Sequence, residues 1–252
     1  MINASPELSA QVNAFPELHP KTDPPRNSPI RGVLITNSDL DHVLGLFSLR
    51  EGNRLSVCAT TAVRATLTKS LGMETVLSSF CGLSWREPPI RNFEPLDLDS
   101  PVETNLRFRA IELPGAPPRF SPGASLEGVH SVAYLFESPR TNRRLLVAPD
   151  VGAVNPALRM ALESADAVLF DGTFWSKDEL RSIRPGAPEA NEMGHVTIKD
   201  CSLDLLAGIR ARWKIYIHIN NTNPILMKDS AQRKAVEAAG LTVGWDGLEF
   251  EV

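Results

Sequence analysis

Short runs of apolar and β-branched residues recur along the chain, and Gly, Pro, Asn and Asp separate them. Short runs between such turn formers are typical of strands, because a helix needs a longer periodic segment. The runs lie at residues 32–36, 54–60, 106–113, 131–138, 143–150, 167–172 and 214–219. We predict a strand at each of these positions.

Four longer segments space their apolar residues three and four apart, as an amphipathic helix does. They lie at residues 61–72, 155–166, 197–213 and 229–240, and the first and last end at Gly72 and Gly240, which suit a helix C-terminus. A hairpin-rich middle, followed by alternating strands and helices, predicts a mixed sheet flanked by helices and therefore the α/β class. Since 252 residues can form one large core, we predict a single domain over residues 1–252.

The first residues read as the end of a strand that leads straight into a helix. Residues 2–4 are strand-like, Ser5 suits a helix cap, and Pro6 suits the first helical position. Because a strand beginning at Met1 would be unusual for a complete domain, we expect that a segment preceded it.

Composition removes several classes of function. The net charge is -4, with both signs interspersed, so no basic stripe is available for a phosphate backbone and nucleic acid is not expected as a partner. Cys58, Cys81 and Cys201 are far apart and form no CxxC pair, which fits a reducing compartment. No apolar run approaches the roughly 18 residues of a membrane span, and no secretion signal is present. We expect a cytoplasmic protein without membrane insertion and leave a homodimer open.

Side chains that can bind a metal ion lie in or just after four of the predicted strands. Asp41 and His42 follow the first strand, Asp150 and Asp171 end two later ones, and His218 lies in the last. Two imidazoles with two or three carboxylates would suit Fe(II), Mn(II) or Zn(II). Taken singly, an aspartate after a strand is more often a turn former, and a lone histidine is more often a core residue.

Several segments together resemble one family. Residues 36–42, "TNSDLDH", have the frame of the metallo-β-lactamase loop T-H-x-H-x-D-H, with Asn37 and Asp39 where that superfamily usually has histidines. The segments "NASPEL", "DLDHVLGLFSLREG", "LFDGTFW", "EMGH" and "YIHINNTNPIL" resemble the pyrroloquinoline quinone (PQQ) biosynthesis protein B family, PqqB, a branch of the same superfamily. The resemblance runs from residue 2 to the closing "DGLEFEV" and implies the αββα sandwich of metallo-β-lactamases.

The resemblance also implies a ligand set. Asp41, His42, Asp150 and His218 would hold one metal, equivalent to the second site of a binuclear metallo-β-lactamase. The first site would stay unfilled, because Asn37 is a poor ligand and "ELPGAPPRF" contains no histidine. The family begins with a glycine-rich strand and a cysteine cluster for structural zinc. Neither is present here, so we expect the first strands, about fifty residues, to be missing relative to the family.

One metal with two histidines and carboxylates resembles the 2-His-1-carboxylate sites of non-haem iron enzymes that bind O2. The resemblance implies an Fe(II)-dependent oxygenase that hydroxylates a tyrosine, or a tyrosine-containing peptide, on the way to PQQ. Two alternatives stay open. One is a Zn(II) hydrolase, because zinc accepts the same ligands and activates water. The other is a soluble carrier of PQQ or its precursor towards the periplasm.

Three further residues are candidates for catalysis. His195, in "EMGH", is predicted to donate a proton or support a ligand, with a helix cap as the equal alternative. Asp39 and Asp171 are predicted to act as general bases or to orient the ligating histidines.

Candidate substrate contacts lie after two of the strands. Asn220, Asn221 and Asn223 could bind substrate amides or fix His218, and their ordinary reading is an Asx-type turn. Trp175, with Phe174, could stack on an aromatic substrate, although core packing is expected for one of the two.

Overall fold

The structure is a computed structural model that describes residues 1–20, 23, 28–51, 54–97, 104–121, 123, 125 and 127–252. The chain divides into two compact units, and each is described on its own. Unit 1 comprises Met1–Pro89, Pro95–Thr104 and Ala116–Ser131. Unit 2 comprises Ile90–Glu94, Asn105–Gly115 and Val132–Val252.

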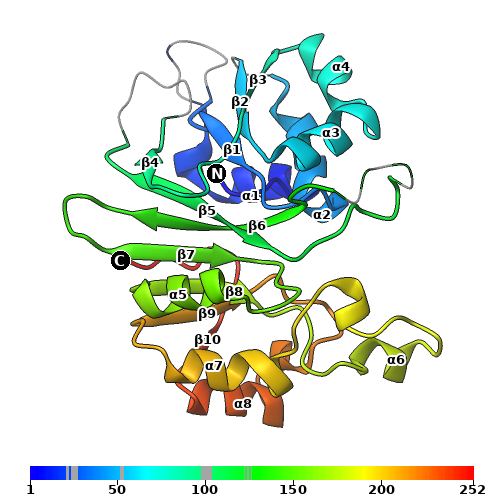
Figure 1. Cartoon of the computed structure of the whole chain (residues 1–252), viewed down its shortest axis with the longest axis vertical. Coiled ribbons are helices and arrows are strands. Elements are labelled where there is room, and N and C mark those ends of the chain that lie inside the picture. The colour runs from blue at the N-terminus through cyan, green and yellow to red at the C-terminus, as the bar shows by residue number, and fades with distance from the viewer. Residues whose placement is uncertain are drawn as a thin grey trace. The chain divides into compact units, whose positions relative to one another are not determined.

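Unit 1 is built on a parallel three-stranded sheet with helices beside it (Figure 1). The strands, in spatial order, are β1 (Gly32–Leu34), β2 (Leu55–Cys58) and β3 (Leu83–Arg86). The helices are α1 (Leu8–Ala14), α2 (Leu40–Val43), α3 (Thr61–Lys69) and α4 (Met73–Ser78), with 3-10 turns at Pro16–Leu18 and Leu44–Leu49. Leucine and valine side chains from these elements form one buried core.

The start of unit 1 agrees with the sequence only in part. Ile2 forms a parallel bridge to Leu34, as a strand end would. However, α1 begins at Leu8, and the Ser5 hydroxyl has no partner in the described structure, so Ser5 does not cap the helix with its side chain. By contrast, the predicted helix after β2 begins as expected, because Thr60 accepts a hydrogen bond from the Val63 amide.

Unit 2 contains a larger sheet of mixed strand direction. Its spatial order is β10-β9-β8-β7-β6-β5-β4. The strands are β4 (Glu94–Pro95), β5 (Arg107–Leu113), β6 (Ser131–Glu137), β7 (Arg144–Ala148), β8 (Ala167–Asp171), β9 (Trp213–Ile217) and β10 (Thr242–Val243). β6 and β7 are antiparallel, whereas β7, β8, β9 and β10 pair in parallel. The predicted mixed sheet is therefore confirmed.

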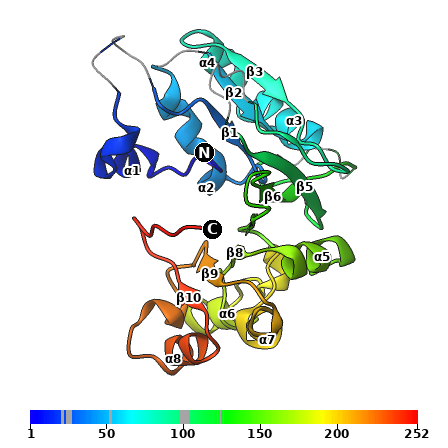
Figure 2. The ribbon, with the colours of Figure 1, turned by 90° about the vertical axis from the view of Figure 1, so that its left-hand side faces the viewer.

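Helices cover one face of this sheet (Figure 2). They are α5 (Pro156–Ser164), α7 (Leu203–Gly208) and α8 (Ala231–Ala238), with a π-helix at Ile198–Ser202 and a 3-10 turn at Pro224–Leu226. The unit also contains α6 (Glu179–Ile183) and a 3-10 turn at Asn191–Met193. Leu158 of α5, Leu206 of α7 and Val236 of α8 share one core with the strand residues Leu146 and Val168. In the described part of the chain, no helix is both long and apolar enough to cross a lipid bilayer.

The strand order fixes where unit 2 can bind a ligand. β7, β8 and β9 are adjacent and parallel, so their carboxyl ends lie at the same edge of the sheet. Polar side chains that follow these strands are brought together there, and such edges are common ligand sites in α/β proteins.

Candidate metal centre

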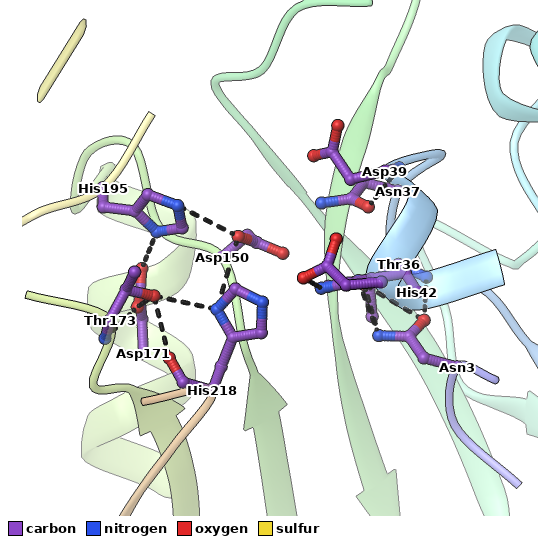
Figure 3. Close-up of polar contacts among 11 residues, drawn as sticks. Asn3, Thr36, Asn37, Asp39, His42, Asp150, Asp171, Thr173, His195 and His218 are labelled. Atoms are coloured by element: carbon purple, nitrogen blue, oxygen red, sulfur yellow. Dashed lines mark hydrogen bonds and ion pairs between the residues drawn. The ribbon is translucent and has the colours of Figure 1, made fainter. Parts of the chain in front are cut away.

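Asp150, His195 and His218 meet at this edge of unit 2 (Figure 3). Asp150 lies two residues beyond β7, and His218 directly follows β9. Each residue offers one ligand atom, and these atoms all lie within 4.8 Å of one another. Asp150 Oδ1 lies 3.5 Å from His195 Nε2 and 3.7 Å from His218 Nδ1. The structure thus joins two predicted ligands, Asp150 and His218, with the predicted catalytic residue His195.

Asp171, at the end of β8, fixes the orientation of His195. Its carboxylate is fully buried and lies 2.8 Å from His195 Nδ1. It also accepts hydrogen bonds from the Val151 amide at 2.9 Å and from the amide and hydroxyl of Thr173 at 2.9 and 2.6 Å. Because an ionised carboxylate only accepts hydrogen bonds, Nδ1 carries the proton and Nε2 faces Asp150. Of its two predicted roles, Asp171 therefore fits orientation better than proton abstraction.

The charges around His195 favour its protonated form. Burial lowers the pKa of His195, but the hydrogen bond to Asp171 and the negative charges of Asp171 and Asp150 outweigh burial and the opposing charge of His218. The pKa of His195 is therefore raised above its ordinary value. Since the same carboxylates would attract a cation, the site favours positive charge in the form of either a proton or a metal ion.

His218 occupies a strained backbone conformation. Its φ of 54° lies in the left-handed region, which a residue with a Cβ enters at a cost of about 1 kcal/mol or more. The Thr173 hydroxyl, which donates its proton to Asp171, lies 2.8 Å from His218 Nδ1 and can accept a hydrogen bond from it, which fixes the His218 ring. Gly172 allows this approach of β8 to β9, since a Cβ there would lie 3.0 Å from the Ile217 carbonyl oxygen.

The loop after His218 is held by its own side chains. Asn223 is 2% exposed, donates to the carbonyl of Gly172 at 2.8 Å and accepts from the Ile225 amide at 3.1 Å. This supports the Asx-turn alternative for Asn223. Asn220 donates to the Thr222 hydroxyl at 2.9 Å, whereas Asn221 is exposed.

Glu179, the first residue of α6, anchors the same loop. It is 8% exposed and accepts hydrogen bonds from the Thr222 hydroxyl and the Trp175 amide, both at 2.6 Å. Trp175 is half-buried against the core of unit 2, and Phe174 is buried with its ring edge-on to His195, the ring centroids being 5.7 Å apart. Core packing therefore applies to Phe174, as expected for one of this pair.

A second polar cluster lies in unit 1, around His42. Its ring is 3% exposed, and Nδ1 lies 2.8 Å from Asn3 Nδ2 and 3.0 Å from the Thr36 hydroxyl. Asn3 Oδ1 accepts from the Thr36 amide at 2.9 Å, which orients the Asn3 amide so that its NH2 group donates to His42. His42 Nδ1 therefore accepts a hydrogen bond, and a neutral ring carries its proton on Nε2.

The acidic residues of this loop are exposed. Asp41 Oδ2 lies 3.6 Å from His42 Nε2. Asp39 precedes α2, and its amide donates to Asn37 Oδ1 at 3.0 Å. The roles of Asp39 as a catalytic group and of Asp41 and His42 as ligands remain predictions from the sequence.

Sequence reasoning did not single out Thr173 or Asn3. Thr173 stands two residues after Asp171 within "LFDGTFW", and a hydroxyl at that spacing can bond back to the preceding carboxylate, so this signal was available. Asn3 lies 39 positions before its partner His42, and only the fold brings the two together.

The fold is that of the metallo-β-lactamase superfamily, and the model of the beta-lactamase superfamily domain matches residues 1–219. Coenzyme PQQ synthesis protein B of Klebsiella pneumoniae is 38% identical over 98% of this chain and 80% of its own length. The protein of the same name from Pseudomonas aeruginosa is 36% identical over 100% of this chain and 83% of its own length. The chain belongs to this coenzyme PQQ synthesis protein B family.

A solved structure supports the same assignment. It is the crystal structure of Zn(2+)-bound PqqB from Methylobacterium extorquens, with a TM-score of 0.86 and 32% sequence identity. The match covers 100% of this chain and 82% of that one. The predicted family and fold class are therefore confirmed.

Proposed function

We propose that this chain is a non-haem, iron-dependent hydroxylase that acts on a tyrosine, or on a tyrosine-containing peptide precursor of PQQ. The observation that carries the proposal is the meeting of Asp150, His195 and His218, two imidazoles and one carboxylate. This is the donor set of the non-haem iron enzymes that use O2, and it leaves coordination positions open. A bound Fe(II) would supply the binding and activation of O2.

The residues of the triad fit a metal ion. Two ligand atoms about 2.1 Å from one ion lie at most about 4.2 Å apart. The distance of 3.5 Å from Asp150 Oδ1 to His195 Nε2 meets this limit, and the ligand atoms of the three residues all lie within 4.8 Å of one another. Asp171 leaves the lone pair of His195 Nε2 on the side of Asp150, in the way that carboxylates orient ligating histidines in known metal sites.

The predicted ligands Asp41 and His42 belong to unit 1, and their assignment to the same metal rests on the sequence. In the structure, His42 Nδ1 accepts from Asn3, whereas a neutral histidine that binds a metal through Nε2 carries its proton on Nδ1. We therefore rank His195 above His42 as a ligand. A cytoplasmic site of action and O2 as cosubstrate are parts of the same proposal.

A zinc hydrolase is the second candidate, and the zinc bound to the Methylobacterium extorquens relative favours it. Against it, binuclear hydrolases place a second metal beside the first. Asn37 and Asp39 occupy the positions where the superfamily loop has histidines, so that second site lacks its usual ligands. A soluble carrier of PQQ or its precursor is the third candidate, and it requires no metal chemistry.

Anaerobic reconstitution separates these candidates. The metal-free chain is loaded with Fe(II) or Zn(II), mixed with a tyrosine-containing dipeptide, and exposed to O2 in the presence of ascorbate, which supplies the two electrons that reduce the second oxygen atom of O2 to water. We expect the peptide to gain the mass of one oxygen atom with Fe(II) only, and the Asp150→Asn variant to lose both iron and activity. Ester or phosphodiester cleavage with Zn(II) in the absence of O2 would replace the hydroxylase with the hydrolase, and PQQ binding without turnover by the iron-loaded chain would favour the carrier.

A further inference from the structure

Three arginines of unit 2 surround one aromatic ring at the end of the sheet away from the metal centre. The guanidinium carbons of Arg107, Arg109 and Arg144 lie 5.8, 5.5 and 5.5 Å from the centroid of the Phe93 ring. Arg107 and Arg109 lie on β5, and Arg144 begins β7 (Figure 1). We refer to these four residues as the arginine cluster.

One carboxylate bridges two arginines of the cluster. Glu137, at the end of β6 and 9% exposed, accepts from Arg144 Nε and Nη2 at 3.0 and 2.8 Å. Arg107 Nη1 lies 3.4 Å from the other oxygen of Glu137, and Arg107 Nη2 donates to the Phe93 carbonyl at 3.1 Å. Arg107 and Arg144 therefore share the negative charge of Glu137, and the charge of Asp166 also acts on Arg144.

Arg109 has a different environment. Its guanidinium makes no hydrogen bond or ion pair with any residue that the structure describes, and it lies over the face of Phe93. Partial burial and the positive charge of Arg144 both lower the pKa of Arg109. A half-buried cation with five N–H donors thus lies beside a like charge, and an anion would relieve this repulsion.

We propose that the arginine cluster binds a small oxyanion, a phosphate group or a carboxylate, with Arg109 as its main donor. The planar fork of a guanidinium matches two oxygens of either group, and the ring of Phe93 holds the fork in place. The site is distinct from the metal centre, because Arg144 begins β7 and Asp150 follows the opposite end of that strand. The ligand would therefore be an effector or a charged group of a partner, and not the group that reacts at the metal.

Thermal unfolding of the full chain tests this. The probes are sodium phosphate and sodium succinate, each compared with sodium chloride at equal ionic strength. When the anion concentration is ten times its dissociation constant, the bound anion should raise the melting temperature by about 3 °C or more. The Arg109→Gln variant should lose this rise, and Arg184→Gln, which changes an exposed arginine of the same unit, should keep it.

The comparison uses the shift caused by the anion, so a lower starting stability of Arg109→Gln does not affect the result. A rise with phosphate alone would assign the ligand as a phosphate group, and a rise with both anions would show that a carboxylate is sufficient. An equal rise in wild type and Arg109→Gln would place the anion elsewhere and overturn the proposal. No rise above that in sodium chloride would overturn it as well.

Discussion

Replacing Asp171 by asparagine should change which nitrogen of His195 carries the proton. The wild-type carboxylate accepts from His195 Nδ1, so Nε2 keeps a lone pair. In the Asp171→Asn variant, the asparagine side-chain oxygen can still accept from both the backbone amide and the hydroxyl of Thr173. The asparagine NH2 group then faces His195 and the backbone N–H of Val151. An NH2 group donates, so His195 would accept at Nδ1 and carry its proton on Nε2, where a metal must bind.

The size of the effect follows from these contacts. The Val151 N–H loses its acceptor in a fully buried position, which costs about 1–3 kcal/mol, and the loss of the charged bond to His195 adds to it. We expect a total of about 2–4 kcal/mol, or a melting temperature lower by roughly 5–15 °C. Metal affinity should fall by about 10- to 100-fold, as for other residues that orient a ligating histidine.

Two measurements check this prediction. Nitrogen-15 NMR of labelled histidine reports the protonated nitrogen of His195, and competition with a chelator reports metal affinity. Asp200→Asn is the matched control, because Asp200 is an exposed carboxylate of the same unit that accepts from Thr197 at 3.0 Å. Unchanged metal affinity in folded Asp171→Asn, with Nδ1 still protonated, would refute the reasoning.

Three further changes have defined outcomes. Glu179→Ala leaves the Thr222 hydroxyl and the Trp175 amide without their acceptor and should cost about 2–4 kcal/mol in urea unfolding, whereas Glu179→Gln, which keeps one acceptor, should cost less than half of that. His42→Ala should weaken Fe(II) binding, measured by chelator competition, if His42 is a ligand as the sequence predicts; unchanged affinity would remove it from the ligand set. Burial raises the pKa of Asp166, but hydrogen bonds from the Arg144 amide and Arg143, with the charges of both arginines, outweigh it and lower this pKa overall. The stability from this carboxylate is thus present above about pH 4 and lost as pH falls through the lowered pKa, so wild type and Asp166→Asn should converge in unfolding free energy in acid.

The sequence predicted most of the sheet because its strands have strong local signals. Each predicted strand from 106–113 to 214–219 corresponds to one of β5 to β9, and both Gly72 and Gly240 have positive φ. β3, β4 and β10 were missed, because β4 and β10 have two residues each and every residue of β3 is only half-buried. Their pairing depends on neighbouring strands and not on local pattern.

The candidate site was predictable where its residues follow strands, and not where they depend on packing. Asp150, Asp171 and His218 stand within two residues of strand ends, so their convergence follows from parallel pairing. His195 comes from a loop between α6 and α7, and its contact with Asp171 could not be read from spacing. The left-handed backbone of His218 could not be read from the sequence either, because few non-glycine residues adopt positive φ.

The spacing of the triad along the chain has a consequence for folding. A metal held by Asp150, His195 and His218 would close two loops of 45 and 23 residues, counted by subtracting the residue numbers, and would tie three segments that a disordered chain rarely brings together. Such an ion would act as a reversible cross-link that stabilises the folded arrangement of the ends of β7 and β9. Local unfolding of this sheet edge would release the metal, so metal binding and the local stability of this edge would be coupled.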